Sequence, residues 1–253
     1  MSPSRRTARI AGLWFIGTFV FSIPAVLLYD PVLGDTGFIL GSGLDARISL
    51  GALLEILVAV SNVATAVVLF PILRRTSEAV SLGYVALRIV ESTIIVVGLV
   101  SLMSVVTLRD DLAGGSDSAS LEIAGRSLVA LHDWTFLLGP QFCAGLGNGL
   151  LLGYLMYRSG LVPSRVALLG LIGGPLAFLG GILVLFGALE QPSPGLFLIT
   201  APEIVWEGFL AIYLTFWGFR PSPVAAEFDR LGRAGRGNAA FTSGPEPAIR
   251  SAR

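Results

Sequence analysis

The chain has 253 residues, of which 54% are hydrophobic and only 13% are charged, and its mean hydropathy is +0.80. A soluble domain carries nearer a quarter charged residues, so this composition excludes an ordinary soluble protein. The formal net charge is zero; this value excludes nothing by itself, and no nucleic-acid partner is expected. With one cysteine, Cys143, and one histidine, His132, the chain lacks the Cys/His clusters that hold zinc or iron–sulfur centres, and we expect no metal and no cofactor.

Six hydrophobic stretches follow one another along the chain, and each exceeds the roughly 20 apolar residues that a bilayer span requires. They cover residues 8–29, 48–73, 79–107, 131–157, 166–189 and 197–219. The first has a basic start like that of a secretory signal, but its apolar run is longer and five more spans follow it. The sequence therefore predicts an all-α fold, a polytopic bundle of six transmembrane helices formed by residues 1–220, in the cytoplasmic membrane.

Two segments fall outside the predicted bundle. Residues 108–130 are predicted to form the longest loop, because GGSDSAS at 114–120 is typical of turns or disorder, although 121–130 could form a short surface helix. Residues 221–253 are rich in Pro, Gly, Ser, Ala and Arg and contain few large apolar residues. Such a composition predicts a disordered tail, here on the cytoplasmic side.

The arginines are sorted between the two sides of the predicted bundle. Thirteen lie in the termini and in the second and fourth connections, whereas three lie in the opposite connections: Arg47, Arg109 and Arg126. Positively charged residues near helix ends resist translocation, so the side that is rich in arginine is expected to be cytoplasmic. Both termini are therefore predicted inside and the 108–130 segment outside.

Ionisable side chains inside the predicted spans are the candidates for a functional site, because each is costly in hydrocarbon unless it faces a partner. Estimates of depth along the helices place four of them in one layer: Glu55, Arg88, Glu91 and Glu207. Asn62, Asp133, Gln141, Asn148 and Glu203 are secondary candidates. We expect Arg88 to pair with a carboxylate of another span, with Glu55 or Glu207 favoured and Glu91 contributing from its own helix.

One arginine among three carboxylates leaves excess negative charge in this layer. Either a carboxyl is protonated, or a cation or water occupies the site. The alternative interpretation is that Arg88 forms a structural ion pair that only holds helices together.

Other patterns in the spans favour packing over chemistry. His132 and Asp133 are adjacent, so they do not face each other on a helix and fit an interfacial cap better than a catalytic pair. No catalytic or nucleotide-binding motif is present. Gly145, Gly149 and Gly153 have the spacing that lets helices approach closely, and this also leaves open an oligomer formed through glycine-rich helices.

Four segments resemble a bacterial membrane family, the domain of unknown function 4386, and the likeness covers about residues 5–221. They are RTARIAGLWFIG at 6–17, LRIVES at 87–92, GLGNGLLLGYLMYRSGLVPSRVALLGLIGGPLAF at 145–178 and APEIVWEGFLAIYLTFWGFRP at 201–221. Arg165 departs from the pattern, since an aromatic residue is common there. The resemblance implies a six-helix membrane fold and no established activity.

Three functional hypotheses remain open from the sequence. The first is a membrane protein that binds or transports a small solute, a lipid or protons through its buried polar cluster. The second is an intramembrane enzyme acting on a lipid, and the third is a structural or regulatory partner of another membrane protein. An open polar cavity would favour the first hypothesis, and a closed, fully paired cluster would favour the third.

Overall fold

The structure is a computed structural model that describes residues 1–34, 38–40, 45–113 and 117–242. Every regular element among these residues is helical. The long helices are α1 (Pro3–Gly34), α2 (Asp45–Leu73), α3 (Glu78–Ala113), α4 (Ser118–Phe136), α6 (Ser164–Leu185), α7 (Pro194–Phe216) and α8 (Pro223–Thr242). Shorter elements are the 3-10 turn η1 (Phe38–Leu40), two π-helical segments, η2 (Leu137–Cys143) and η3 (Gly145–Leu151), and α5 (Leu152–Ser159).

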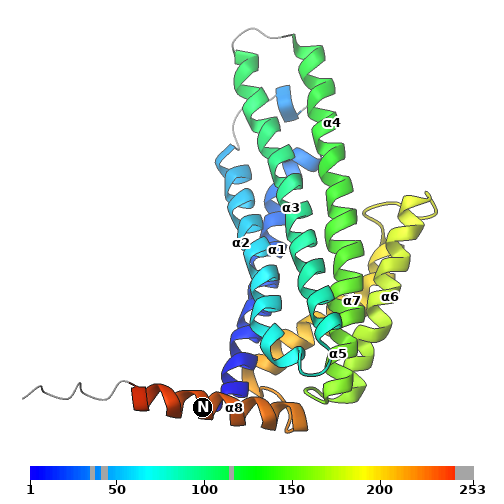
Figure 1. The fold of residues 1–253 in the computed structure, drawn as a ribbon. Helices are drawn as coiled ribbons and strands as arrows, with labels where there is room; N and C mark the ends of the chain where they lie inside the picture. Colours follow the sequence, from blue (N-terminus) through cyan, green and yellow to red (C-terminus); the bar gives the residue numbers. More distant parts are fainter. Residues whose placement is uncertain (35–37, 41–44, 114–116, 243–253) are drawn as a thin grey trace, which may run out of the picture.

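Six helices of the described chain are long and apolar enough to cross a membrane, which confirms the predicted number of spans. The fourth of these is composite, because α4, η2, η3 and α5 follow one another without a break in a single rod from Ser118 to Ser159. The spans lie side by side along one direction (Figure 1). The protein is therefore a helical, multi-pass membrane protein.

The predicted long loop at 108–130 is wrong for most of its length. Helix α3 continues to Ala113 and α4 begins at Ser118, so the two helices form a tall hairpin that rises above α6 and α7 (Figure 1). The carboxylate of Asp117 caps α4 by accepting from the Ser120 backbone N–H at 3.0 Å and from the Ser120 hydroxyl. These hydrogen bonds lower the pKa of Asp117 below the ordinary aspartate value.

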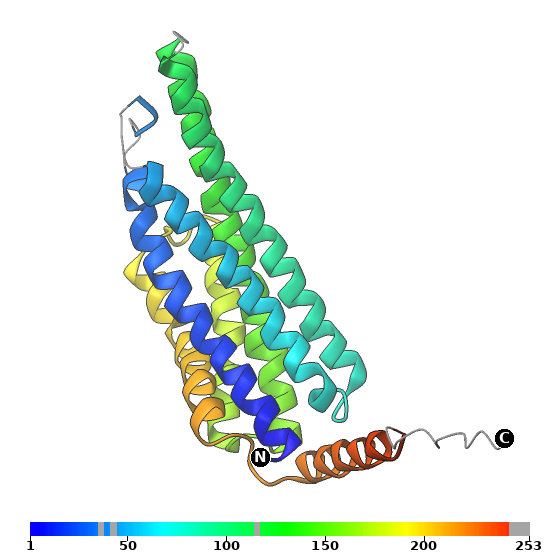
Figure 2. The same ribbon diagram turned by 90° about the vertical axis from the view of Figure 1, so that its left-hand side faces the viewer.

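The prediction of a disordered tail also needs correction, because Pro223–Thr242 forms helix α8; residues 243–253 lie outside the described part. This helix lies across the end of the bundle that carries the N-terminus (Figure 2). The carboxylate of Asp229 accepts from the Ser4 backbone N–H at 2.7 Å, and Glu227 pairs with Arg75 at 2.6 Å. These contacts with the bundle end stabilise a segment whose composition alone indicates disorder.

The end of the bundle nearest the termini is densely packed. Its core surrounds fully buried aromatic side chains, including Phe15, Tyr84 and Trp206. A Cβ atom added to Gly145 would lie 2.8 Å from the Gly174 carbonyl oxygen, and one added to Gly153 would lie 2.9 Å from the Leu171 nitrogen. Because these neighbours are backbone atoms of α6, the glycines lie at a close helix contact, as their spacing predicted.

Candidate functional site

A cavity of about 630 Å³ occupies the bundle beyond this packed end, between α1, α7 and the composite fourth span. Its lining includes Gln191 and Ser193 of the α6–α7 connection, so it reaches the end of the bundle opposite the termini. Its walls also include Ile23 and Leu27 of α1 and Phe197 of α7, which are 58%, 64% and 66% exposed. Large apolar side chains with this exposure face hydrocarbon in a membrane protein, so the cavity also opens sideways into the bilayer.

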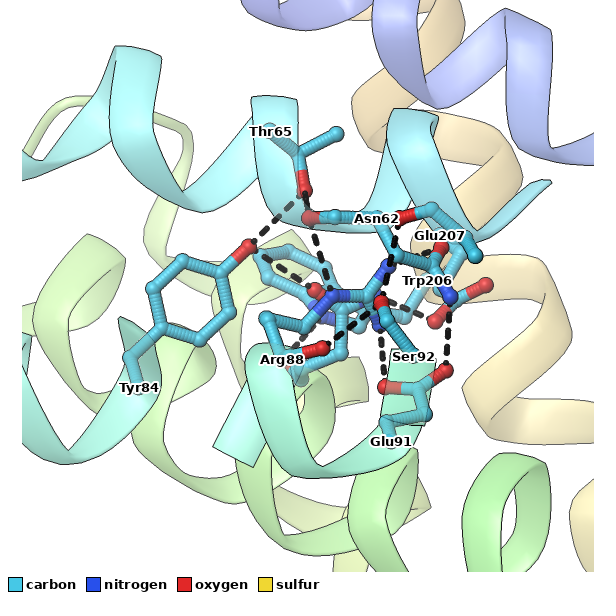
Figure 3. Close-up of polar contacts among 10 residues, drawn as sticks. Asn62, Thr65, Tyr84, Arg88, Glu91, Ser92, Trp206 and Glu207 are labelled. Carbon is cyan, nitrogen blue, oxygen red and sulfur yellow. Dashed lines mark hydrogen bonds and ion pairs between the residues drawn. The ribbon is translucent and has the colours of Figure 1, made fainter. Parts of the chain in front are cut away.

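Arg88 lies on the floor of this cavity inside a closed set of hydrogen bonds (Figure 3). Its guanidinium donates to Glu91 at 2.9 Å and to the Asn62 side-chain oxygen at 2.5 Å, and the Asn62 amide donates to Glu91 at 3.1 Å. All three side chains are buried. Arg88 and Glu91 are three residues apart on α3, so they share a helix face. The result is a neutral ion pair that Asn62 ties to α2, called here the Arg88 ring.

The expected pairing of Arg88 with Glu55 is therefore wrong. Glu55 accepts from the Tyr29 hydroxyl at 2.9 Å, and its other oxygen lies 3.8 Å from His132 Nε2. Glu55 and Asn62 are seven residues apart on α2, which separates them by two turns, about 10 Å, along the same face. The two residues consequently belong to separate polar groups, with Glu55 nearer the far end.

Glu207 also lacks the predicted bond to Arg88, although it lines the same cavity. The side-chain amide of Asn148 donates to Glu207, and the Tyr84 hydroxyl lies 3.3 Å from the Asn148 side-chain oxygen. The indole of Trp206 donates to the Asn148 backbone carbonyl at 3.0 Å. Asn148 thus fixes Glu207 and connects it to Tyr84 and Trp206, which belong to the packed core on the side of the termini.

Glu203 is the exception among these buried groups. It lies one turn before Glu207 on α7, lines the cavity and is only 3% exposed. Among the described residues, neither of its carboxylate oxygens has a hydrogen-bond partner. Buried polar groups are nearly always bonded, and an unbonded carboxylate is among the most costly groups to bury. Glu203 is therefore the group in this cavity with unused capacity to bind.

The π-helical segments direct two amides of the fourth span inward. Gln141 in η2 donates to the Ala177 carbonyl at 2.7 Å and to the Thr200 hydroxyl at 2.8 Å, while Asn148 in η3 meets Glu207. Pro140 lies within η2, where it lacks a backbone donor. Wide π turns inside helices occur frequently at functional sites, and here both segments line or close the cavity.

Asp133 lies apart from the cavity floor. Its carboxylate is 3.9 Å from His132 Nδ1, and its side chain is 62% exposed. The expectation that these adjacent residues do not face each other and form a helix cap is therefore wrong, because both lie inside α4 and their side chains turn toward each other. His132 and Glu55 line a side pocket of about 60 Å³, and Tyr29 contacts both of them. We call Tyr29, Glu55, His132 and Asp133 the His132 group.

Several of these residues escaped the sequence analysis for one reason. Four side chains each donate a hydrogen bond to Glu55, Asn62 or Asn148, but they count as apolar or neutral in a search for charges within spans: Tyr29, Thr65, Tyr84 and Trp206. A search for hydroxyl and indole donors in the same layer as the carboxylates could have found them. Within the described residues, no group of three or more His, Cys, Asp or Glu side chains is arranged to hold a metal ion.

The model of the family described as domain of unknown function DUF4386 matches residues 10–218. The chain belongs to the DUF4386 family. No curated protein and no solved structure matches it. The DUF4386 match begins within α1, includes Arg88, Glu203 and Glu207, and ends before α8.

Proposed function

We propose that this DUF4386 protein binds a small amphiphilic ammonium compound, with the cationic head at Glu203 and the apolar part between α1 and α7. The observation that carries the proposal is that Glu203, a residue of the cavity lining, has both carboxylate oxygens buried without a hydrogen bond among the described residues. A primary ammonium group has three N–H donors and one positive charge, so it satisfies such a carboxylate.

The charges around the cavity favour a cation over an anion. Arg88 is neutralised by Glu91 inside the Arg88 ring, which leaves the carboxyls of Glu203 and Glu207 as the remaining ionisable groups of the floor. An anionic head would meet these acids without a free arginine to pair with. A cationic head would meet them with opposite charge, in a region where attraction is stronger than in water.

The walls of the cavity favour a ligand with an apolar tail. They consist mainly of aromatic and aliphatic side chains, among them Phe19, Ile23, Phe136 and Phe197. A volume of about 630 Å³ falls within the roughly 300–1,000 Å³ of small-molecule sites. An open cavity of this kind supports a binding protein over a purely structural partner, which would need only a closed and paired cluster.

The test uses three probes with one tail, octylammonium, octanol and octanesulfonate, and protein in lipid nanodiscs. Octylammonium is expected to bind, and Glu203→Gln is expected to weaken binding about ten- to a hundredfold, because a charge-assisted bond contributes about 1.5–3 kcal/mol. Glu122→Gln, which removes a surface acid on α4, is the matched control and should bind normally. Equal binding of all three probes, or full binding by Glu203→Gln, contradicts the proposal.

The proposal includes the orientation of the cavity, because the arginine-rich termini point to a cytoplasmic end and the cavity reaches the other. With Cys143→Ser as background, a cysteine introduced by Gln191→Cys should react with an impermeant thiol reagent added to intact cells. One introduced by Ser2→Cys should react only after the cells are opened. The reverse pattern would place the mouth of the cavity inside.

A further inference from the structure

The His132 group extends from the edge of the cavity to the far surface, and its role follows from what must happen to Glu203. We infer that the protein exchanges cations for protons: an ammonium ligand displaces a proton from Glu203, and the proton leaves through Glu55, His132 and Asp133. This inference rests on the proposed function and deepens it, since it adds the proton as a second ligand of Glu203 and a route by which that proton leaves.

The exchange follows from the neighbours of Glu203. The charged groups around it are Glu207 on the same helix and Arg88 and Glu91 on α3, and Asn62, the polar residue that α2 contributes to the cavity, is neutral. Arg88 directs its three hydrogen bonds to Glu91 and Asn62, and among the described residues none of them reaches Glu203. Without a cationic ligand, a proton is the species that can neutralise this carboxyl.

The step is balanced in atoms and charge. A protonated Glu203 and an ammonium ion give a Glu203 carboxylate paired with the ammonium, plus one free proton. No bond of the ligand is formed or broken, and no electrons are transferred. Glu203 and the bound cation together carry a charge of +1 before the proton is released and zero after it. Release is favourable because it removes a net charge from a buried site.

The route is suggested by the geometry of the His132 group. Its side pocket of about 60 Å³ shares Ser22, Val58 and Ile95 with the main cavity, so the two spaces adjoin. From there His132 Nε2 is 3.8 Å from Glu55, and Nδ1 is 3.9 Å from Asp133. Both separations are beyond a direct hydrogen bond and within reach of a small side-chain rotation or one bridging water.

His132 has the properties that a proton carrier needs at this place. Its side chain is 6% exposed, whereas that of Asp133 is 62% exposed, so the pair crosses from the protein interior to the surface within two residues. One ring nitrogen faces Glu55 and the other faces Asp133, and imidazole can accept at one nitrogen and donate at the other. Tyr29 holds Glu55 in position by its hydrogen bond and packs edge-on against the His132 ring.

Among the described residues, the charged and titratable groups that face His132 are the other three members of this group. Helix α1 contributes Tyr29, α2 contributes Glu55 and α4 contributes Asp133. Helix α3 faces the imidazole with Gly98, which has no charge. Two acids on either side of one imidazole are the arrangement in which a proton can enter from one carboxylate and leave to the other.

The first experiment measures the linkage between cation binding and protons. Octylammonium is the probe, because its primary amine, with a pKa near the roughly 10.4 of lysine, stays charged through neutral pH and keeps the N–H donors proposed to meet Glu203. The protein is held in nanodiscs in weak buffer with a pH-sensitive dye. We expect one proton to be released for each cation bound. The dissociation constant of the cation should fall about tenfold for each unit rise in pH, as long as Glu203 is protonated in the unliganded protein. The exchange is overturned if the cation binds without release of a proton and its affinity does not change over the whole pH range in which the protein is folded. Failure of every cation to bind would instead contradict the proposed function.

The second experiment tests the route. His132→Phe keeps an aromatic ring against Tyr29 but cannot carry a proton, and Asp133→Asn is a milder change at the exposed end. In stopped-flow measurements, both variants are expected to slow proton release at least tenfold while the amount of cation bound at equilibrium stays the same. Trp134→Phe, an exposed neighbour outside the His132 group, is the control. Proton release at the wild-type rate in both variants overturns the route, whatever the stoichiometry.

Discussion

Arg88 and Glu203 line the same cavity and are buried to a similar degree, yet Arg88 is hydrogen-bonded to its neighbours and Glu203 is not. Arg88 has Glu91 and Asn62 around it, and its charge is matched inside a closed set of bonds. Glu203 has no bonded neighbour among the described residues. Burial of a charge in a membrane therefore does not by itself mark a functional group; the state of its bonds separates a structural charge from one available to a ligand.

The same contrast extends to the two ends of the bundle. Toward the termini, helices touch through glycines and the core is filled with aromatic side chains. Toward the far end, α1 and α7 leave a cavity between them. Dense packing holds the helices on one side of the polar layer, and this allows the other side to remain hollow.

The largest effect is expected at Arg88. Arg88→Met strands the buried Glu91 and should lower the free energy of unfolding by about 3–5 kcal/mol, because breaking a buried ion pair leaves an uncompensated charge. The double variant Arg88→Met/Glu91→Gln should recover part of the loss, measured by denaturant titration in detergent. Arg88→Met/Glu55→Gln should show no recovery, since Glu55 is bonded to Tyr29; equal recovery in both doubles would contradict the assigned pairing.

A smaller loss is expected where helices touch. Gly153→Ala places a methyl group 2.9 Å from the Leu171 backbone nitrogen, so the contact with α6 must open, at a cost of about 1–3 kcal/mol. Gly208→Ala is the control, because its methyl group would meet only Phe19 at 3.9 Å. Thermal unfolding should separate the two variants. Equal melting temperatures would mean that the helices at Gly153 can move apart to make room for a methyl group without loss of stability.

Glu203→Gln should change stability in the opposite direction from Arg88→Met. A neutral amide is less costly to bury than an unbonded carboxyl group that must hold a proton or a cation, so the free energy of unfolding should rise by about 1–2 kcal/mol at neutral pH. Glu91→Gln, which breaks the Arg88 ring, should be destabilising under the same conditions. A clear loss of stability in Glu203→Gln would show that this carboxylate has a structural bond after all.

The smallest effect is expected at Asp117, whose carboxylate is exposed to water. The hydrogen bonds from Ser120 lower the pKa of Asp117, so its carboxylate stabilises the start of α4 above the pKa of the unfolded chain, and this contribution disappears as pH falls through the lowered folded value. Asp117→Ala should raise amide hydrogen exchange at residues 118–121 at neutral pH and leave global unfolding unchanged. Against the wild type, the difference in exchange should vanish in acid.

The spans and the ion pair of Arg88 with Glu91 could be predicted from sequence because both depend on local spacing. Apolar runs above about 20 residues need no partner to be recognised, and residues three apart on a helix share a face. The position of Glu55 could not be predicted, because depth along a helix says nothing about which neighbour the side chain faces. Its partner Tyr29 gives no signal in a search for charged groups.

Other features depend on contacts that composition does not show. Helix α8 is stabilised by Ser4 and Arg75 from distant parts of the chain. The π-helical segments differ from an α-helix by small changes in the hydrogen-bond register, and neither residue type nor periodicity indicates them. The cavity depends on how α1, α7 and the fourth span are placed relative to one another, which no single helix encodes.

The unequal lengths of the helices have a consequence for how a ligand would arrive. Helix α3, with 36 residues, is about 54 Å long, whereas α6, with 22 residues, is about 33 Å long and just matches a hydrocarbon layer of about 30 Å. The mouth near Gln191, at the end of α6, therefore lies at the level of the lipid headgroups. An amphiphile already dissolved in that leaflet has its ammonium at the height of the mouth and its tail at the height of the apolar walls. Under the proposed function, it would reach the protein by lateral diffusion in two dimensions, so occupancy would follow its concentration in the leaflet, and a compound scarce in water would still fill the site.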